Sequence, residues 1–299
     1  MSSYSAFIQT PAKVNLGLKI VCRRADGYHD IHTVMEPITL ADSLYCEFTE
    51  GRRNRFVMQC PQLANLDPAD NLVVRAARLI FGMAQEQGCR LSGSWNFFLD
   101  KKIPFGAGLG GGSSNAAGVV RLFDKFYGLH LSSADLCRAA AAIGADVPFF
   151  INPELSLVEG IGDRITPLGR ARPRYYLLVK PPFPINTAWA YAALQAGEAR
   201  CPVEYDCEQF KAGAIADGYA LENDFEAAVM THHPLLAELK QWLLRQSGVL
   251  GALMSGSGSV VYAVFADLPA AIEAETAARR QFAGLGCRFF LARNLITFT

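Results

Sequence analysis

Five glycines fall within seven residues of this chain, at Gly106, Gly108, Gly110, Gly111 and Gly112. Glycine adopts positive φ without strain and lets a ligand come close to the backbone, because it has no Cβ. The segment that follows begins near Ser113 and is rich in Ala and Val, which predicts a helix. The first free N–H groups of a helix carry about half a positive charge. A glycine-rich loop directly before such a helix is typical of a phosphate-binding site.

Two other glycine-rich nucleotide-binding patterns do not fit. Residues 106–111 read Gly-x-Gly-x-x-Gly, but a dinucleotide-binding unit needs a second parallel strand ending in an acid about 20 residues on. Here the predicted helix ends at Gly128 and another helix follows directly. The Gly-Lys-Ser/Thr of a Walker A loop is also missing. A purely structural glycine loop remains possible, although its backbone entropy cost favours phosphate binding as the interpretation.

The bulk composition indicates an ordinary globular protein. The chain has 299 residues, 51% of them hydrophobic, with 28 basic and 28 acidic residues. This balance gives no general attraction to nucleic acid or acidic lipid, so neither is expected as a partner. The sequence shows no apolar run for a membrane span and no signal peptide, and we expect a cytoplasmic location. The eight scattered cysteines form no C-x-x-C, so neither disulfides nor structural zinc are expected.

The first half of the chain predicts a β-meander with helices. The expected elements are strands at 13–22 and 31–40 around an Asp26-Gly27 turn, a third strand after residues 41–43, a helix that starts through Asp67–Asp70 and ends by Gly88, and a strand at 95–99. The helix after the glycine loop ends at Gly128. Ser132 with Asp135 resembles a capping box for another helix, which stops at Gly144 and is followed by Asp146 and an extended segment.

A composition shift at 152–173, rich in Gly and Pro, predicts a domain boundary, and we divide the chain into residues 1–155 and 156–299. The second part predicts a strand at 175–179, a helix near 223–246, paired strands at 249–254 and 259–265, a helix at 268–283 and a strand at 287–292. Helices on one face of a mainly antiparallel sheet define an α+β fold class.

These residues carry a family resemblance. Pro104 to Ala117 resembles the Pro-x-x-x-Gly-Leu-Gly-Ser-Ser-Ala-Ala loop of the galactose, homoserine, mevalonate and phosphomevalonate (GHMP) kinase superfamily. The Gly-Leu-Gly-Gly-Gly-Ser-Ser-Asn-Ala-Ala form is similar to that of the kinases of the non-mevalonate isoprenoid pathway. Other stretches agree in the same order: residues 11–16 (Pro-Ala-Lys-Val-Asn-Leu), 24–29 (Arg-Ala-Asp-Gly-Tyr-His), 144–148 (Gly-Ala-Asp-Val-Pro) and 255–258 (Ser-Gly-Ser-Gly). The resemblance therefore spans nearly the whole chain.

The resemblance implies a two-domain α+β kinase. Residues 1–155 would form an ATP-binding domain similar to domain 2 of ribosomal protein S5, and residues 156–299 a ferredoxin-like plait that binds the substrate. The implied reaction uses ATP and Mg²⁺ to phosphorylate a cytidine diphosphate-linked methylerythritol, in a monomer or weak homodimer. Another GHMP kinase, for mevalonate or homoserine, is the alternative. A noncatalytic RNA-binding module is a more distant one, which the neutral charge disfavours.

The resemblance also implies the roles of individual residues. Asp146 would accept the proton of the acceptor hydroxyl. Lys13 would hold and polarise the pair formed by the Asp146 carboxylate and that hydroxyl. The residues expected to bind ATP are Asn71, Lys101, Pro104, Gly106, Gly108, Leu109, Gly110, Gly111, Gly112, Ser113, Ser114 and Asn115, with Ser114 also facing the metal. Those expected to bind the acceptor are Asn15, Tyr28, His29 and Tyr191. Without the resemblance, Lys13 and Lys101 read as strand-end lysines and Asn71 as a helix start.

Overall fold

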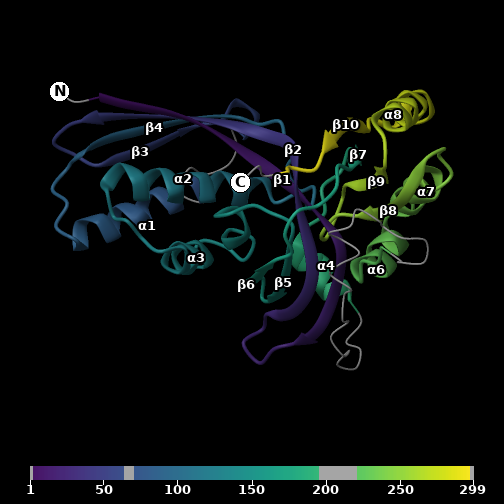
Figure 1. The fold of residues 1–299 in the computed structure, drawn as a ribbon, viewed down its shortest axis with the longest axis horizontal. Helices are drawn as coiled ribbons and strands as arrows, with labels where there is room; N and C mark the ends of the chain where they lie inside the picture. The colour runs from purple at the N-terminus through teal and green to yellow at the C-terminus, as the bar shows by residue number, and fades with distance from the viewer. Residues whose placement is uncertain (1–2, 64–70, 195–220, 297–299) are drawn as a thin grey trace. The chain divides into compact units, whose positions relative to one another are not determined.

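The computed structural model describes residues 3–63, 71–194 and 221–296 (Figure 1). The chain divides into two compact units. Unit 1 comprises Met1–Ala12, Ala41–Ile103 and Gly110–Pro153, and unit 2 comprises Lys13–Leu40, Pro104–Leu109 and Glu154–Thr299. The long strands β1 (Ser3–Arg23) and β2 (His29–Glu50) contribute residues to both units, as does the glycine-rich loop. The division into an ATP-binding part, residues 1–155, and a substrate-binding part, residues 156–299, stays a prediction.

Unit 1 is a sheet with helices packed on one face (Figure 1). Strand β4 (Gly93–Asp100) pairs in parallel with β3 (Arg55–Gln59) and antiparallel with the second part of β2. The helices are α1 (Leu72–Glu86), α2 (Gly111–Tyr127) and α3 (Ser133–Ala141). Alternate residues of β4 are buried, and the Trp95 ring lies 4.5 Å from that of Phe123 in α2. The Trp95 indole N–H donates to the Tyr127 hydroxyl at 2.9 Å, so its one polar group is satisfied.

Unit 2 contains a second sheet, in the order β10-β7-β9-β8, in which every neighbouring pair is antiparallel. Its strands are β7 (Tyr175–Lys180), β8 (Val249–Met254), β9 (Val261–Phe265) and β10 (Arg288–Arg293). Helices α4 (Thr187–Ala193), α6 (Phe225–His232) and α7 (Pro234–Leu243) precede β8, and α8 (Leu268–Phe282) precedes β10. This chain order with this strand order is a β-α-β-β-α-β arrangement. The predicted ferredoxin-like plait is confirmed.

The first part of β2 carries a buried ion pair within unit 2. Glu36 and Arg174 are each 1% exposed and their side chains lie 2.8 Å apart. The Tyr176 hydroxyl donates to the same carboxylate, and the Asn294 side chain donates to it at 3.1 Å. The carboxylate therefore has three different donors, which a charge in the interior requires.

Most element predictions are confirmed. Gly128 ends α2 in the left-handed conformation, with φ of 62°. The Ser132 side chain accepts from the Asp135 N–H and caps α3. In the part of the chain that the structure describes, no helix has the length and apolar character that crossing a bilayer needs.

Four element predictions need correction. No third strand begins after residues 41–43, because β2 continues through Asp42 to Glu50. The helix expected near 223–246 is two helices, because Pro234 has no N–H and keeps His233 out of the helical region. Asp146 leads into a short 3₁₀ helix, Pro148–Phe150, rather than an extended segment. The stretch 152–173 contains two unpredicted strands.

These two strands, β5 (Ser156–Gly160) and β6 (Arg164–Pro167), pair with each other, and β5 pairs with the first part of β2. They were hidden in the sequence because each is only a few residues long and glycines surround them. The predicted helix-start cluster Asp67–Asp70 lies outside the described residues.

Candidate active site

The first half of the glycine-rich loop, Pro104–Leu109, packs within unit 2 against the segment that links β8 to β9. Gly106 and Gly108 have positive φ, of 59° and 74°. A Cβ on Gly108 would lie 1.9 Å from the carbonyl oxygen of Ser255. No side chain fits in that space, so the close approach of the two backbones requires glycine. The Ser-Gly-Ser-Gly motif thereby fixes the path of this half of the loop.

The second half of the loop starts helix α2 in unit 1. Gly110 is its N-cap residue, in the left-handed conformation with φ of 67°. The first bond of the helix runs from the Ser114 N–H to the Gly110 carbonyl at 2.9 Å, so the preceding N–H groups have no acceptor inside the helix. The first turn holds no acidic residue, and Gly112 is exposed. This positive helix end suits an anion such as phosphate.

The Ser114 side chain is the second feature of this turn that suits a ligand. It is 1% exposed, and its hydroxyl has no hydrogen-bond partner among the described residues. A buried hydroxyl without a partner costs about 1–3 kcal/mol, so an oxygen of a ligand or a metal ion would offset that cost. The described residues contain no group of three or more His, Cys, Asp or Glu side chains that could hold a metal by themselves.

Lys13 is held against the glycine-rich loop inside unit 2. Its side chain is buried, at 3% exposure. The ammonium donates to the Gly108 carbonyl at 2.9 Å and to Asn15 Oδ1 at 2.6 Å. Asn15 is fully buried and donates in turn to Thr33 Oγ1 at 2.9 Å. Asn15 therefore orients the Lys13 ammonium. The expected contact of Asn15 with the acceptor substrate stays a prediction.

Lys101 and Asn115 meet at a buried carboxylate that the sequence did not single out. The Lys101 ammonium pairs with Asp42 at 2.5 Å and lies 3.5 Å from Asn115 Oδ1. Asn115 is 2% exposed and also donates to Thr10 and to Asp42. Asn71 is the N-cap of α1, and its side chain accepts from the Val73 N–H. Its helix-start role is confirmed, and the ATP contacts of all three predicted residues stay predictions.

The structure brings together two of the predicted acceptor-binding residues. The His29 ring stacks on the Tyr191 ring, with centroids 4.6 Å apart and planes inclined by 21°. Tyr191 also contacts Phe225 edge-on at 4.9 Å. Tyr28, the residue before His29, is 59% exposed. Partial burial, and then the positive charge of Arg23, lower the pKa of His29 from its ordinary value.

Asp146 lies in the turn between α3 and the short 3₁₀ helix. Its side chain is half-buried, and the turn closes through the Val147 N–H, which donates to the Gly144 carbonyl at 3.1 Å. The carboxylate therefore belongs to a well-defined turn in unit 1. Lys13 belongs to unit 2, so the pairing of the two side chains stays a prediction.

Sequence reasoning missed the residues that hold the loops in place. The Asn223 side chain donates to the carbonyls of Met254 and Gly256, each at 2.7 Å, and so clamps the Ser-Gly-Ser-Gly turn. The Tyr262 hydroxyl donates to the Asn15 carbonyl at 2.6 Å. Neither residue stands in a recognisable motif. Asp42 was also missed, because the sequence placed it between two strands, where an acid is expected to be exposed.

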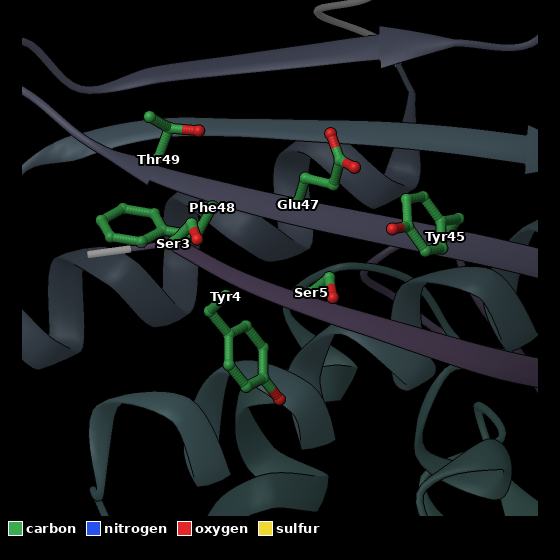
Figure 2. Close-up of a pocket in the computed structure, with 7 residues that line it drawn as sticks. All are labelled: Ser3, Tyr4, Ser5, Tyr45, Glu47, Phe48 and Thr49. Carbon is green, nitrogen blue, oxygen red and sulfur yellow. The ribbon is translucent and has the colours of Figure 1, made fainter. Parts of the chain in front are cut away.

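A hollow of about 290 Å³ lies elsewhere in unit 1, over strands β1 and β2 (Figure 2). Its lining consists of Ser3, Tyr4, Ser5, Tyr45, Glu47, Phe48 and Thr49. None of these is a predicted site residue, and Glu47 is the one carboxylate among them. The hollow therefore has no part in the candidate active site.

Comparison with known proteins identifies kinase sequences along the chain. Residues 71–153 match the family described as GHMP kinases N terminal domain, and residues 208–284 match GHMP kinases C terminal. A 4-diphosphocytidyl-2-C-methyl-D-erythritol kinase of Geobacter sulfurreducens is 38% identical, over 89% of this chain and 92% of that protein. The enzyme of the same name from Chlorobaculum tepidum is 34% identical, over 92% and 94% of the two chains.

Solved structures of kinases also match this chain. The crystal structure of a 4-(cytidine 5'-diphospho)-2C-methyl-D-erythritol kinase matches with a TM-score of 0.74 and 31% identity, over 97% of this chain and 99% of that one. A homoserine kinase from Cytophaga hutchinsonii matches with a TM-score of 0.72 but 17% identity, over 98% and 95% of the two chains. The latter similarity concerns the fold alone.

The close approach at Gly108 predicts the effect of adding one methyl group. Gly108→Ala should lower the free energy of unfolding by at least about 2 kcal/mol, because overpacking costs about 1–3 kcal/mol and left-handed φ costs about 1–2 kcal/mol more once a Cβ is present. Gly112→Ala is the matched control, since its Cβ would lie 3.6 Å from Leu72, an ordinary contact. Urea unfolding measures both variants. Equal stability of the Gly108 variant and the wild type would contradict the close approach.

The stacked His29 predicts a pH effect. Because its folded-state pKa is lowered, the unfolded chain binds more protons below the ordinary value of 6.5. The stability contributed by the neutral ring is therefore complete above pH 6.5 and is lost as the pH falls through the folded-state pKa. Tyr191→Ala should raise the pKa of His29 toward 6.5, because water replaces the stacked ring. An NMR titration of the imidazole measures this, with Tyr28→Ala as the control. A pKa that Tyr191→Ala leaves unmoved would count against the stack.

Proposed function

Because the chain belongs to the 4-diphosphocytidyl-2-C-methyl-D-erythritol kinase family, we propose that it transfers the γ-phosphoryl group of ATP to the 2-hydroxyl of 4-diphosphocytidyl-2-C-methyl-D-erythritol, giving the 2-phosphate and ADP. The observation that carries this proposal is an identity of 38% over 89% of this chain and 92% of the relative's. The chain is thus an ATP-dependent small-molecule kinase of the GHMP superfamily. The product belongs to the non-mevalonate route to isoprenoid precursors.

The triphosphate of ATP would bind at residues 110–114. The free N–H groups of the first turn of α2 point along the helix axis, and their partial charge favours an anion. The Ser114 hydroxyl, buried and without a partner among the described residues, would accept or donate one contact to a phosphate oxygen or to Mg²⁺. Bound Mg²⁺ would neutralise charge that develops on the phosphate oxygens. Pro104, Gly106, Gly108 and Leu109 would contribute the backbone on the other side of the loop.

The acceptor hydroxyl would lose its proton to Asp146. A carboxylate is a weak acceptor for an alcohol proton, so the transfer would occur late, as the new P–O bond forms. This suffices because phosphoryl transfer depends mainly on positioning and charge stabilisation. The Lys13 ammonium, fixed by Asn15 and by the Gly108 carbonyl, would stabilise the negative charge of the reacting groups. The proton that Asp146 accepts would return to water after product release.

The cytidine of the acceptor would be recognised at the β1–β2 turn. Aromatic rings stack on bases, and a neutral imidazole offers one donor and one acceptor to a base edge. The lowered pKa of His29 keeps its ring neutral at physiological pH. The stack between His29 and Tyr191 supports this proposal, since it fixes the imidazole plane. The exposed Tyr28 ring would supply a further stacking face.

The remaining expectations belong to the same proposal. We expect the enzyme to work in the cytoplasm, to bind Mg²⁺ with its nucleotide, to act as a monomer or weak homodimer, and to bind no nucleic acid. The equal numbers of basic and acidic residues, 28 each, support the last point.

ADP release with three acceptors tests the proposal. The cytidine diphosphate-linked methylerythritol should support turnover, whereas mevalonate and homoserine should not. The discrimination should be large, because a site built to hydrogen-bond a cytosine leaves polar groups unpaired when the base is missing. Turnover with mevalonate or homoserine alone would replace the proposed acceptor. Retention of RNA without turnover of ATP would overturn the kinase proposal.

Asp146→Asn tests the proposed proton acceptor. Turnover should fall by about 100- to 10,000-fold, the usual contribution of general base catalysis, while ATP affinity changes little. The measurements are steady-state kinetics and calorimetric titration with ATP. The control is Asp135→Asn, which removes an exposed carboxylate from α3 in the same unit and should keep wild-type turnover. Wild-type turnover in the Asp146 variant would remove this residue from the mechanism.

A further inference from the structure

Asp42 is a fully buried carboxylate in β2, with 0% exposure. Its Oδ1 accepts the backbone N–H groups of Lys102 and Ile103, each at 2.8 Å. Its Oδ2 accepts the Lys101 ammonium at 2.5 Å and the Asn115 side-chain N–H at 3.0 Å. All these residues belong to unit 1. The carboxylate thus has four donors, which uses the usual capacity of its two oxygens.

These donors come from both ends of the glycine-rich loop. Residues 101–103 lead directly into it, and Asn115 lies in the first turn of α2, just after it. One carboxylate therefore joins the start of the loop to its end. Thr10 in β1 adds to the network, since its hydroxyl accepts from Asn115 at 2.6 Å and donates to the Asp42 carbonyl at 3.4 Å.

The same contact places a positive charge beside the helix start. The Lys101 ammonium would lie 3.0 Å from a Cβ built on Gly111, the first residue of α2. Its side chain is 9% exposed. A buried ammonium needs a charged partner, and Asp42 supplies it. Asp42 is the carboxylate that binds both Lys101 and Asn115, in the first turn of α2.

We propose that Asp42 is a positioning residue for ATP binding: it fixes both ends of the glycine-rich loop and the Lys101 ammonium in the arrangement that receives the phosphates. It does not touch the nucleotide, because it is fully buried beneath its four donors. This inference rests on the proposed kinase function for its ligand. The contacts of Asp42 with both ends of the glycine-rich loop are present in the free protein and do not depend on that function.

Asp42→Asn tests the proposal by keeping the side-chain size and removing the charge. We expect the KM for ATP to rise about tenfold, equivalent to about 1.4 kcal/mol, with the KM for the acceptor unchanged within about a factor of two. The matched control is Glu36→Gln, which removes the charge from a second buried ion pair in the same strand. It should lower stability without raising the KM for ATP. An equal rise of the KM for ATP in both variants would overturn the proposal. So would an equal rise of the KM for ATP and of the KM for the acceptor in Asp42→Asn.

Amide hydrogen exchange of the ligand-free protein separates this inference from the proposed function. Asp42→Asn should speed exchange of the amides of residues 114–116 by about tenfold, or about 1.4 kcal/mol, because the helix start loses its anchor. Glu36→Gln should leave this exchange unchanged. If Asp42→Asn alone does not fold, the double variant Asp42→Asn/Lys101→Met removes both charges and should show the same faster exchange. Unchanged exchange refutes the positioning role. Faster exchange in the Asp42 variant, together with no kinase turnover by the wild-type protein, would refute the proposed function alone.

Discussion

The close contact between Gly108 and Ser255 determines how the rest of unit 2 can be built. Two backbone segments more than a hundred residues apart in sequence approach so closely that a Cβ on Gly108 would stand 1.9 Å from an oxygen. The Gly108 carbonyl also accepts the Lys13 ammonium at 2.9 Å and the Ser255 hydroxyl at 2.9 Å. One peptide group therefore joins β1, the glycine-rich loop and the β8–β9 turn. Three separate motifs of the family resemblance therefore meet at one peptide group.

Buried polar side chains in β1 and β2 supply the second level of organisation. Lys13, Asn15, Glu36 and Asp42 are each at most 3% exposed, and each finds partners within its own unit. Burying a charge without a partner is costly, so these pairs specify which segments lie next to the strands. The hydrophobic core would tolerate several arrangements, whereas the polar partners select one.

Local patterns predicted most of the secondary structure, because glycine, proline and capping residues act through their neighbours. Gly128 and Ser132 mark helix ends that the structure contains. Two of the failures depend on distant contacts that a local pattern does not contain. Asp42 looked like a strand end, but donors sixty residues later keep it inside β2. The β5–β6 hairpin was too short to show a pattern and is held by pairing with β2.

The candidate site likewise has parts that the sequence predicts and parts that it does not. The glycine-rich loop and the helix start could be predicted because the glycines are close together in sequence, and α2 begins there. The contact between His29 and Tyr191 joins residues that are more than 160 positions apart, and the family resemblance was needed to name both. Asn223 holds the Ser-Gly-Ser-Gly turn through two side-chain hydrogen bonds, and Tyr262 holds β1 through one. No sequence pattern marks such residues.

The stack of His29 on Tyr191 has a consequence for the kind of base contact available. Centroids 4.6 Å apart are already in van der Waals contact, whereas a planar base inserted between two rings needs roughly 7 Å, twice the carbon contact distance. The inner faces of this ring pair are therefore occupied by each other. In the proposed function, a pyrimidine would therefore contact an outer face or an edge of this ring pair, and the two rings would not need to separate.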